Sequence, residues 1–325
     1  MTNRRTALVA VCLGLPAVAV QAQGGGDTPY PNRPIRIIVP WPAGGSVDAI
    51  TRALSARLSA QLGQQVIVDN RAGASGNIGA AAGATAAPDG YTLLVATTPM
   101  VISASLQSGL RFNVATEFAA IGLITTVPNV LVVGPEGPAS VKDLIAQAKA
   151  APGRVRFASS GPGTQLHLVG ESFKRAAGID LVHVPYKGGP PALTDLLGGH
   201  VQMMFPGIPA VLPYLRARQL KPLAVTSRQR LRLLPEVPTM AEAGFPTVEA
   251  VDWYGIVAPA GTPKDIVARL NVEIVKALGA QDLHDELLAK GFLPATSTPE
   301  QFATLMESDR RKWATVIRQA GITSE

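Results

Sequence analysis

The chain has 325 residues, a formal net charge of +6 and 47% hydrophobic residues, which is sufficient for two domains with buried cores. Aromatic residues make up only 5% and the basic residues are scattered, so the basic and aromatic stripe of a nucleic-acid-binding surface is excluded. The one cysteine, Cys12, lies near the N-terminus, so the rest of the chain has no thiol for catalysis or metal binding.

The first residues have the pattern of a secretory signal. Arg4 and Arg5 precede an apolar run over residues 7–20, and small residues before position 23 predict cleavage after Ala22. The run has 14 residues, whereas a membrane-spanning helix needs about 20. We therefore predict that residues 1–22 are removed and that the mature chain is secreted across the inner membrane. Adjacent arginines leave twin-arginine export open beside the ordinary route.

Strand and helix patterns alternate along most of the remaining chain. Apolar runs predict strands at 35–39, 65–68, 92–96, 130–133, 156–158, 181–184, 202–205, 223–226 and 255–258. Amphipathic spacing predicts helices at 49–62, 141–150, 166–177, 191–197 and 209–218. Continuous apolar strands separated by helices are typical of parallel sheets in an α/β fold.

The last 60 or so residues show only helical patterns. Two helix starts are predicted where Thr262 and Thr298 are each followed by proline, with threonine as the N-cap. Breaks near residues 127 and 247 predict two lobes, one formed by 32–127 plus 248–325 and the other by 128–247. The chain would cross between them twice, which makes a hinge with a ligand cleft between the lobes.

A glycine loop at residues 42–48 (PAGGSVD) joins the first strand to the first helix. The amides of Gly44, Gly45 and Ser46 would lie at a helix N-terminus, where anions bind. A tight turn without a ligand is the alternative, and neither a P-loop nor a dinucleotide motif is present. Asp48 would compete with an anion, so it orders the loop, meets a ligand amine or is simply a first-turn acid.

A second loop of the same type occupies residues 158–167 (ASSGPGTQLH). Ser160 and Thr164 supply hydroxyl groups there, and Gly163 exposes an amide. Two such loops, one in each predicted lobe, can face each other across a cleft, which favours a ligand site over two unrelated turns. His167 follows in the helix, where a packed, hydrogen-bonded histidine is the favoured interpretation.

Two further strand ends carry polar groups. Lys187 follows the strand and Gly188 begins a Gly-Gly-Pro-Pro turn, and the lysine either pairs with an anion or is solvated. Thr97 and Thr98 follow the strand at 92–96, where their hydroxyl groups line the same cleft or cap the next turn.

No catalytic centre is predicted. Ser160 lies in Ala-Ser-Ser-Gly, which lacks the Gly-x-Ser-x-Gly pattern of a nucleophile elbow. The four histidines do not have metal-ligand spacing, and no pair of acids is brought together by the sequence. We therefore predict no catalytic residues, no metal and no cofactor.

The assembled motifs resemble the periplasmic substrate-binding proteins of tripartite tricarboxylate transporters, the Bug-type receptors. The matching stretches include "YPNRPIRIIVPWPAGGSVDAITRAL", "NRAGASGNIGA", "APDGYTLLVAT", "ASSGPGTQLHLVGESFK" and "VHVPYKGGPPALTDLLGGHVQMMF", in the family's order over residues 31–325. The resemblance implies a two-lobed clamshell of type II-like periplasmic-binding-protein architecture. It also implies a carboxylate held by Ala43, Gly44, Gly45 and Ser46 on one lobe. On the other lobe it implies Ser160, Gly163 and Thr164, with His167 ordering the loop.

The chain departs from the family pattern in three places. Trp41 stands where the family usually has Phe, which gives a larger pocket wall. Pro206, followed by Gly207, stands where the family often has an Asp that in some members meets a ligand amine. Ala104 replaces a frequent Asn near the cleft entrance. These changes argue against an amino-acid ligand and favour aliphatic or aromatic mono- or dicarboxylates.

The sequence thus predicts a monomeric receptor that hands a small carboxylate to integral membrane transporter subunits. A sensing subunit for a membrane signalling partner remains an alternative, and a secreted hydrolase a weaker one. The predicted ligand-binding residues are Trp41, Ala43, Gly44, Gly45, Ser46, Asp48, Thr97, Thr98, Ser160, Gly163, Thr164, His167, Lys187, Gly188, Pro206 and Gly207.

Overall fold

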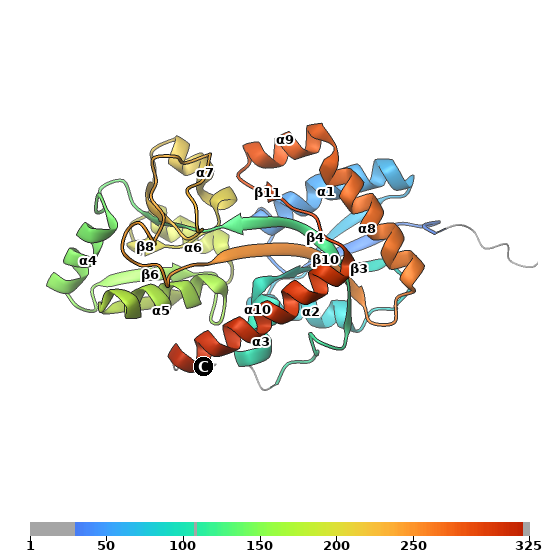
Figure 1. The fold of residues 1–325 in the computed structure, drawn as a ribbon, viewed down its shortest axis with the longest axis horizontal. Coiled ribbons are helices and arrows are strands. Elements are labelled where there is room, and N and C mark those ends of the chain that lie inside the picture. Colours follow the sequence, from blue (N-terminus) through green and yellow to red (C-terminus); the bar gives the residue numbers. More distant parts are fainter. Residues whose placement is uncertain (1–29, 107–108, 321–325) are drawn as a thin grey trace, which may run out of the picture.

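The computed structural model describes residues 30–106 and 109–320, so the predicted signal at residues 1–22 lies outside it. The chain forms two β-sheets, each covered by helices, which give the molecule two lobes (Figure 1). Lobe 1 surrounds the first sheet and lobe 2 the second. The predicted α/β, two-lobed architecture is confirmed. None of the described helices combines the length and the apolar character needed to cross a membrane.

The first sheet has six strands in the order β11-β4-β10-β3-β1-β2. Its strands are β1 (Ile35–Val39), β2 (Val66–Asn70), β3 (Thr92–Thr97), β4 (Phe118–Pro128), β10 (Val251–Pro259) and β11 (Leu293–Pro294). Its helices are α1 (Ser46–Leu62), α2 (Asn77–Ala84), α3 (Thr98–Leu106), α8 (Lys264–Gly279), α9 (Gln281–Ala289) and α10 (Pro299–Ala320). Strand alternation divides the core: Ile35 and Ile37 pack with α1 and α8, whereas Ile38 packs with α3 and α10.

The second sheet has five strands in the order β7-β6-β8-β5-β9. Its strands are β5 (Val130–Val133), β6 (Val155–Ser159), β7 (Leu181–Pro185), β8 (Met203–Met204) and β9 (Lys221–Val225). Its helices are α4 (Val141–Ala150), α5 (Gln165–Ala177), α6 (Gly189–Leu197) and α7 (Ile208–Arg216). Helix α10 extends from lobe 1 to contact α5 (Figure 1), so one hydrophobic cluster runs through both lobes.

The chain passes between the sheets twice, and hydrogen bonds tie the two crossings together. The first crossing is Asn129, between β4 and β5, and the second begins at Thr226, after β9. The Thr226 amide donates to the Asn129 carbonyl at 2.9 Å, and the Ala250 amide donates to the Thr226 carbonyl at 3.1 Å. The Thr226 hydroxyl is also buried between these two segments. The two crossings are therefore joined side by side.

Three expectations about the fold were wrong. The sheets are mixed rather than parallel, because β10 pairs antiparallel with β3 and β4, and β5 pairs antiparallel with β8 and β9. The 11-residue strand β4 was not predicted, since its small residues and Gly122 weaken the strand pattern and its pairing with β10 supplies the order. The tail also contains the short strand β11, which pairs with β4.

The two predicted helix starts in the tail differ in outcome. At α10, the Thr298 hydroxyl accepts from the Gln301 amide at 3.2 Å and the Gln301 side chain accepts from the Thr298 amide at 2.9 Å, so a capping box confirms the prediction. At α8, the helix begins at Lys264 after Pro263, and the Thr262 hydroxyl donates back to Pro259 instead.

Candidate functional site

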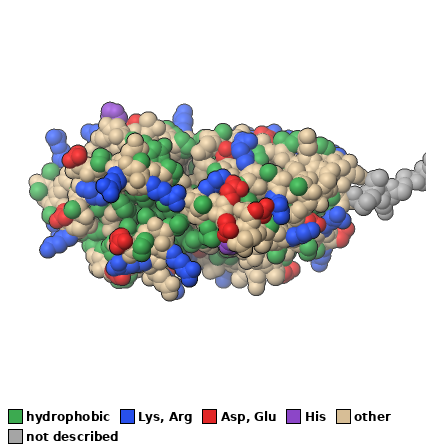
Figure 2. Space-filling view, turned by 90° about the horizontal axis from the view of Figure 1, so that it is seen from above, with side chains coloured by type: hydrophobic (Ala, Val, Ile, Leu, Met, Phe, Trp, Pro, Cys, Tyr) green, Lys and Arg blue, Asp and Glu red, His purple; other side chains and the backbone are tan. Residues whose placement is uncertain are grey.

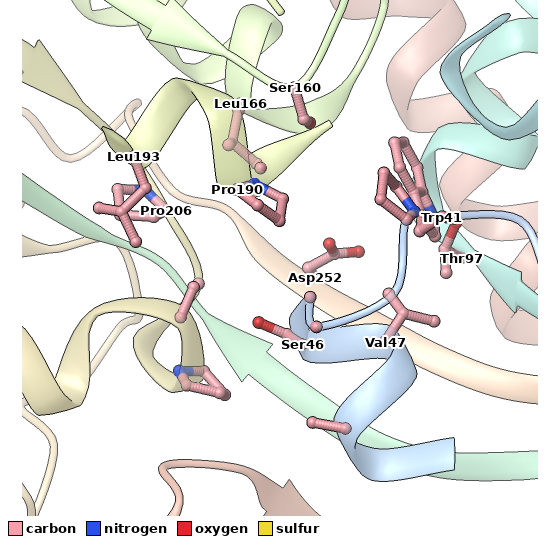
Figure 3. A pocket seen from close by; sticks show the side chains of 18 of the residues that line it. Trp41, Ser46, Val47, Thr97, Ser160, Leu166, Pro190, Leu193, Pro206 and Asp252 are labelled. Carbon is pink, nitrogen blue, oxygen red and sulfur yellow. Dashed lines mark hydrogen bonds between the residues drawn. The ribbon is translucent and has the colours of Figure 1, made fainter. Parts of the chain in front are cut away.

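A cavity of about 450 Å³ lies between the two lobes. Lobe 1 supplies its walls from the β1–α1 loop, the end of β3 and strand β10, and lobe 2 supplies them from the β6–α5 loop, α6 and α7. Seen from above, the molecule is hollowed, with hydrophobic side chains gathered in the hollow and basic ones around it (Figure 2). Pro190, Leu193 and Pro206 form part of an apolar wall opposite Ser46 and Val47 (Figure 3).

The β1–α1 loop directs a helix N-terminus at this cavity. Gly44 takes a left-handed φ of 80°, which lets the chain turn from the buried strand β1 into α1. Helix α1 begins at Ser46, and Gly45 at the N-cap has no side chain to satisfy the first amides. The N–H groups of the first turn have no partner inside a helix, so Ser46 and Val47 offer donors and a positive dipole end to the cavity.

Asp48 stabilises the β1–α1 loop through hydrogen bonds. Its carboxylate is buried and accepts from the Gly44 amide at 3.0 Å, from Arg52 at 2.9 Å and from the Asn70 side chain at 2.9 Å. Burial raises the pKa of Asp48, but these hydrogen bonds outweigh burial and leave the pKa below its ordinary value. Of the roles left open by the sequence, the geometry assigns loop ordering to Asp48.

The β6–α5 loop satisfies most of its own amides. Gly161 donates to Ser159 Oγ at 3.2 Å, Gly163 donates to His167 Nδ1 at 3.2 Å, and Thr164 donates to the Gly161 carbonyl at 3.3 Å. The Thr164 hydroxyl also donates to that carbonyl, at 2.7 Å. Ser160 is the part of this loop that reaches the cavity. Hydrogen bonds within the loop therefore occupy most of its donors, and few of them face the cavity.

Two histidines support the β6–α5 loop. The rings of His167 and His183 stack with centroids 3.9 Å apart, and Phe157 stacks on His183 at 4.9 Å. His183 Nε2 lies 2.6 Å from Ser159 Oγ. Burial lowers the pKa of His167 to about 4, and burial together with the neighbouring His167 lowers that of His183 to about 3. Both rings are neutral at neutral pH, so Nδ1 of His167 accepts and Nε2 carries the proton.

This pair predicts an acid-sensitive stability. The unfolded chain protonates both histidines below about pH 6.5, whereas the folded protein keeps them neutral down to pH 4 or lower. The contribution of the two histidines to the free energy of unfolding is therefore expected to be greatest above pH 6.5. It falls between pH 6.5 and pH 4, by at most about 1.4 kcal/mol per pH unit for each histidine. Urea unfolding from pH 7 to pH 4 measures the slope. His167→Gln reduces it, whereas the same change at exposed His200 leaves it unchanged; equal slopes in both variants contradict the prediction.

The two lobes also touch each other directly. The Ser75 hydroxyl of lobe 1 donates to the Pro162 carbonyl of lobe 2 at 2.9 Å. A Cβ built on Gly163 would lie 2.6 Å from Leu106 Cδ1, and one built on Gly188 would lie 2.9 Å from Pro42 Cγ. These contacts join elements of the two sheets, so the structure has the lobes closed on each other.

The predicted site residues divide into two groups by position. Eight of them line the cavity: Trp41, Gly44, Gly45, Ser46, Thr97, Ser160, Pro206 and Gly207. The others lie beside or behind its walls: Ala43, Asp48, Thr98, Gly163, Thr164, His167, Lys187 and Gly188. Ala43 and Lys187 are exposed, and Thr98 is buried behind the end of β3. Trp41 is oriented by its indole N–H, which donates to Thr97 Oγ1 at 3.3 Å.

Several lining residues were not predicted from the sequence. Strand β10 contributes Asp252 and Tyr254, and the lining also includes Tyr214 and Lys290. Asp252 stands in "VEAVDWYGIVAPAG", where a lone acid before an apolar strand could have been noted. Nothing local, however, shows that this strand reaches the cavity.

Within the described part of the chain, the serine and histidine side chains do not form an accessible nucleophile–base pair. Among the described residues, His183 bonds to Ser159, which is fully buried and does not line the cavity. Ser160 does line it, but in the described ranges no histidine is hydrogen-bonded to Ser160. Nor do three His, Cys, Asp or Glu side chains in those ranges gather as a metal site.

Comparison with known proteins identifies the family of the chain. A family model described as "Tripartite tricarboxylate transporter family receptor" matches residues 50–322. The chain is similar to protein BugT of Bordetella pertussis, with 39% identity over 322 residues and 98% of each chain covered. Its structure is similar to R. palustris Rpa4515 with adipate, with a TM-score of 0.88, 36% identity and 90% and 99% of the two chains covered.

A second solved structure is MatC from Rhodopseudomonas palustris with bound malate. Its TM-score is 0.83 at 29% identity, with 89% of this chain and 100% of that chain covered. The matches span both lobes and the glycine loops that face the cavity between them. The chain therefore belongs to the tripartite tricarboxylate transporter family of receptors.

Proposed function

We propose that this protein is a periplasmic receptor that binds a small carboxylate between its lobes and delivers it to a tripartite tricarboxylate-type membrane transporter. The observation that carries the proposal is the N-terminus of α1, with the Ser46 hydroxyl and unpaired first-turn amides, facing a cavity closed by both lobes. Amide dipoles balance the charge of a carboxylate without a basic side chain. The adipate and malate held by two similar proteins support this ligand class.

Binding is expected to stabilise the closed form. Only a ligand that contacts both lobes gains interactions on closure, so its affinity difference between open and closed forms shifts the population. The lobe boundaries proposed for this movement are 32–127 with 248–325, and 128–247. They are supported by the sheets, because the strands of the first sheet fall within 35–128 and 251–294 and those of the second within 130–225. We further propose export through a cleaved signal, a monomeric state and binding without catalysis.

A carboxylate screen tests the ligand class. Purified mature protein is titrated with aliphatic and aromatic mono- and dicarboxylates, and the unfolding midpoint is followed. A true ligand at about 100 times its Kd stabilises the fold by about 2.7 kcal/mol. The neutral amide of each acid serves as a matched control, because it keeps the shape and loses the charge. An upward shift with an acid and none with its amide supports the proposal. No shift with any carboxylate contradicts it.

A further inference from the structure

Asp252 places a carboxylate on the wall of the ligand cavity. Along β10 the side chains alternate, so Asp252 and Tyr254 line the cavity, whereas Trp253 packs on the other side against Phe302 and Asp309. Figure 3 shows the carboxyl group of Asp252 in the space between Pro190, Ser46 and Trp41. The residue is only 8% exposed. It thus faces whatever occupies the space in front of α1.

Neighbouring groups fix the carboxylate and leave part of it unused. The Trp253 amide donates to Oδ1 at 2.9 Å, and Thr98 donates from both its amide and its hydroxyl. A carboxylate has about four acceptor positions, so roughly one remains for the cavity. Burial raises the pKa of Asp252 to about 6, although the bonds from Thr98 and Trp253 lower it and Asp309 raises it. At pH 7.5 the group is mainly ionised.

The charge of Asp252 is not balanced by the protein. Among the described residues, no lysine or arginine forms an ion pair with it. The one basic side chain found among the described lining residues is Lys290, whose ammonium lies 2.6 Å from Glu286. A buried, ionised carboxylate is costly unless a donor or a cation faces it. A ligand can supply that group, and a second bare carboxylate at this position would be repelled.

We propose that Asp252 selects the ligand by accepting a hydrogen bond from a hydroxyl or ammonium group that the bound carboxylate carries. The ligand is then a hydroxy- or amino-substituted carboxylate, with its carboxylate at the α1 loop and its donor at Asp252. This inference rests on the proposed function, because it takes the α1 loop to hold the carboxylate. At position 206, where the family often has an Asp, this chain has proline. Asp252 would supply a carboxylate from a different strand, and the sequence argument against a ligand with an amine then no longer holds.

Matched ligand triplets test the proposal without changing the protein. Each triplet differs only at the carbon next to the carboxylate, which bears hydrogen, hydroxyl or ammonium: propionate, lactate and alanine; succinate, malate and aspartate; phenylacetate, mandelate and phenylglycine. Titration calorimetry at pH 7.5 gives each Kd. In any triplet that binds, the hydroxy or amino member is expected to bind about tenfold more tightly than the unsubstituted one. Which of the two is tighter identifies the donor.

Two variants then locate the preference. Asp252→Asn keeps the shape and is expected to reduce the preference to about twofold. Asp309→Asn is the matched control, because Asp309 is an acid behind β10 that bonds to the Trp253 indole and does not line the cavity. Loss of its charge only lowers the pKa of Asp252 further, and Asp252 is already ionised at pH 7.5, so the preference is expected to remain. Unfolding midpoints check that both variants fold. If Asp252→Asn does not fold, the preference of the unchanged protein for the hydroxy or amino member of each triplet still tests the proposal.

Two results overturn the proposal while the proposed function stands. The first is tightest binding of an unsubstituted acid, and a proton taken up on binding would then show that Asp252 is protonated beside it. Calorimetry in buffers of different ionisation enthalpy detects this uptake. The second is an unchanged substituent preference in Asp252→Asn. If no acid in any triplet or in the wider screen binds, the proposed function fails and this inference fails with it.

Discussion

Replacing Gly163 with leucine is expected to weaken carboxylate binding by about 100-fold, equivalent to about 2.7 kcal/mol, while the chain still folds. Gly163 has a left-handed φ of 69°, and its amide donates to His167. A Cβ at this position would lie 2.6 Å from Leu106 Cδ1 on α3, across the gap between the lobes. A leucine side chain therefore pushes the β6–α5 loop away from lobe 1 and raises the free energy of the closed form in particular.

The matched control is the same substitution at Gly178, the C-cap of α5. Its φ of 59° imposes a similar backbone strain, and a Cβ there meets nothing within 4 Å. Both variants are expected to lose about 1 kcal/mol of unfolding free energy through that strain. Only Gly163→Leu should lose affinity for a carboxylate identified in the screen, as measured by titration calorimetry. Equal dissociation constants for the two variants would show that the approach of Gly163 to Leu106 does not matter for ligand binding.

Replacing Asp48 with alanine is expected to lower the free energy of unfolding by about 3 kcal/mol. The change leaves the Gly44 amide and the Asn70 side chain without their acceptor, and it frees Arg52 from an ion pair. The lowered pKa of Asp48 means that its stabilisation is present above pH 3.8 and is lost as the pH falls through the folded-state pKa. Urea unfolding at pH 7.5 measures the loss.

Asp69 is the matched control for Asp48. It also bonds an arginine, Arg71 at 2.9 Å, but its side chain is 29% exposed and the pair lies at the surface. Asp69→Ala should cost less than about 1 kcal/mol, because exposed ion pairs contribute little. If the two alanine variants lose the same stability, Asp48 does not hold the loop in the way its hydrogen bonds indicate.

Local patterns were sufficient for much of this protein. The strands at 35–39 and 130–133 and the helix at 141–150 have the bounds that the sequence predicts. The two glycine loops also join strand to helix as expected. These features depend on neighbouring residues, through apolar spacing, turn conformation and helix capping, so a linear sequence contains the information.

Local patterns could not predict which side chains form hydrogen bonds with each other. The sequence could not separate the roles of Asp48, because the choice depends on Asn70, which is 22 residues away on β2. Likewise, the amides of Gly44 and Gly163 looked available, but their acceptors are side chains that fold back from the first turns of α1 and α5. Whether a donor is free depends on side-chain orientation, which periodicity does not report.

By itself the sequence determined the two-lobed α/β class, the family, the strand-to-helix loops and eight of the residues that line the cavity. The tertiary structure decided the antiparallel insertion of β10 between β3 and β4, and with it the position of Asp252 beside a loop that ends some 200 residues earlier. The physical reason is that burial and capping act within a segment, whereas strand order is set by pairing between distant segments. The role of the buried Asp252 carboxylate depends on that pairing, because the pairing places Asp252 next to its hydrogen-bond donors and on the wall of the cavity.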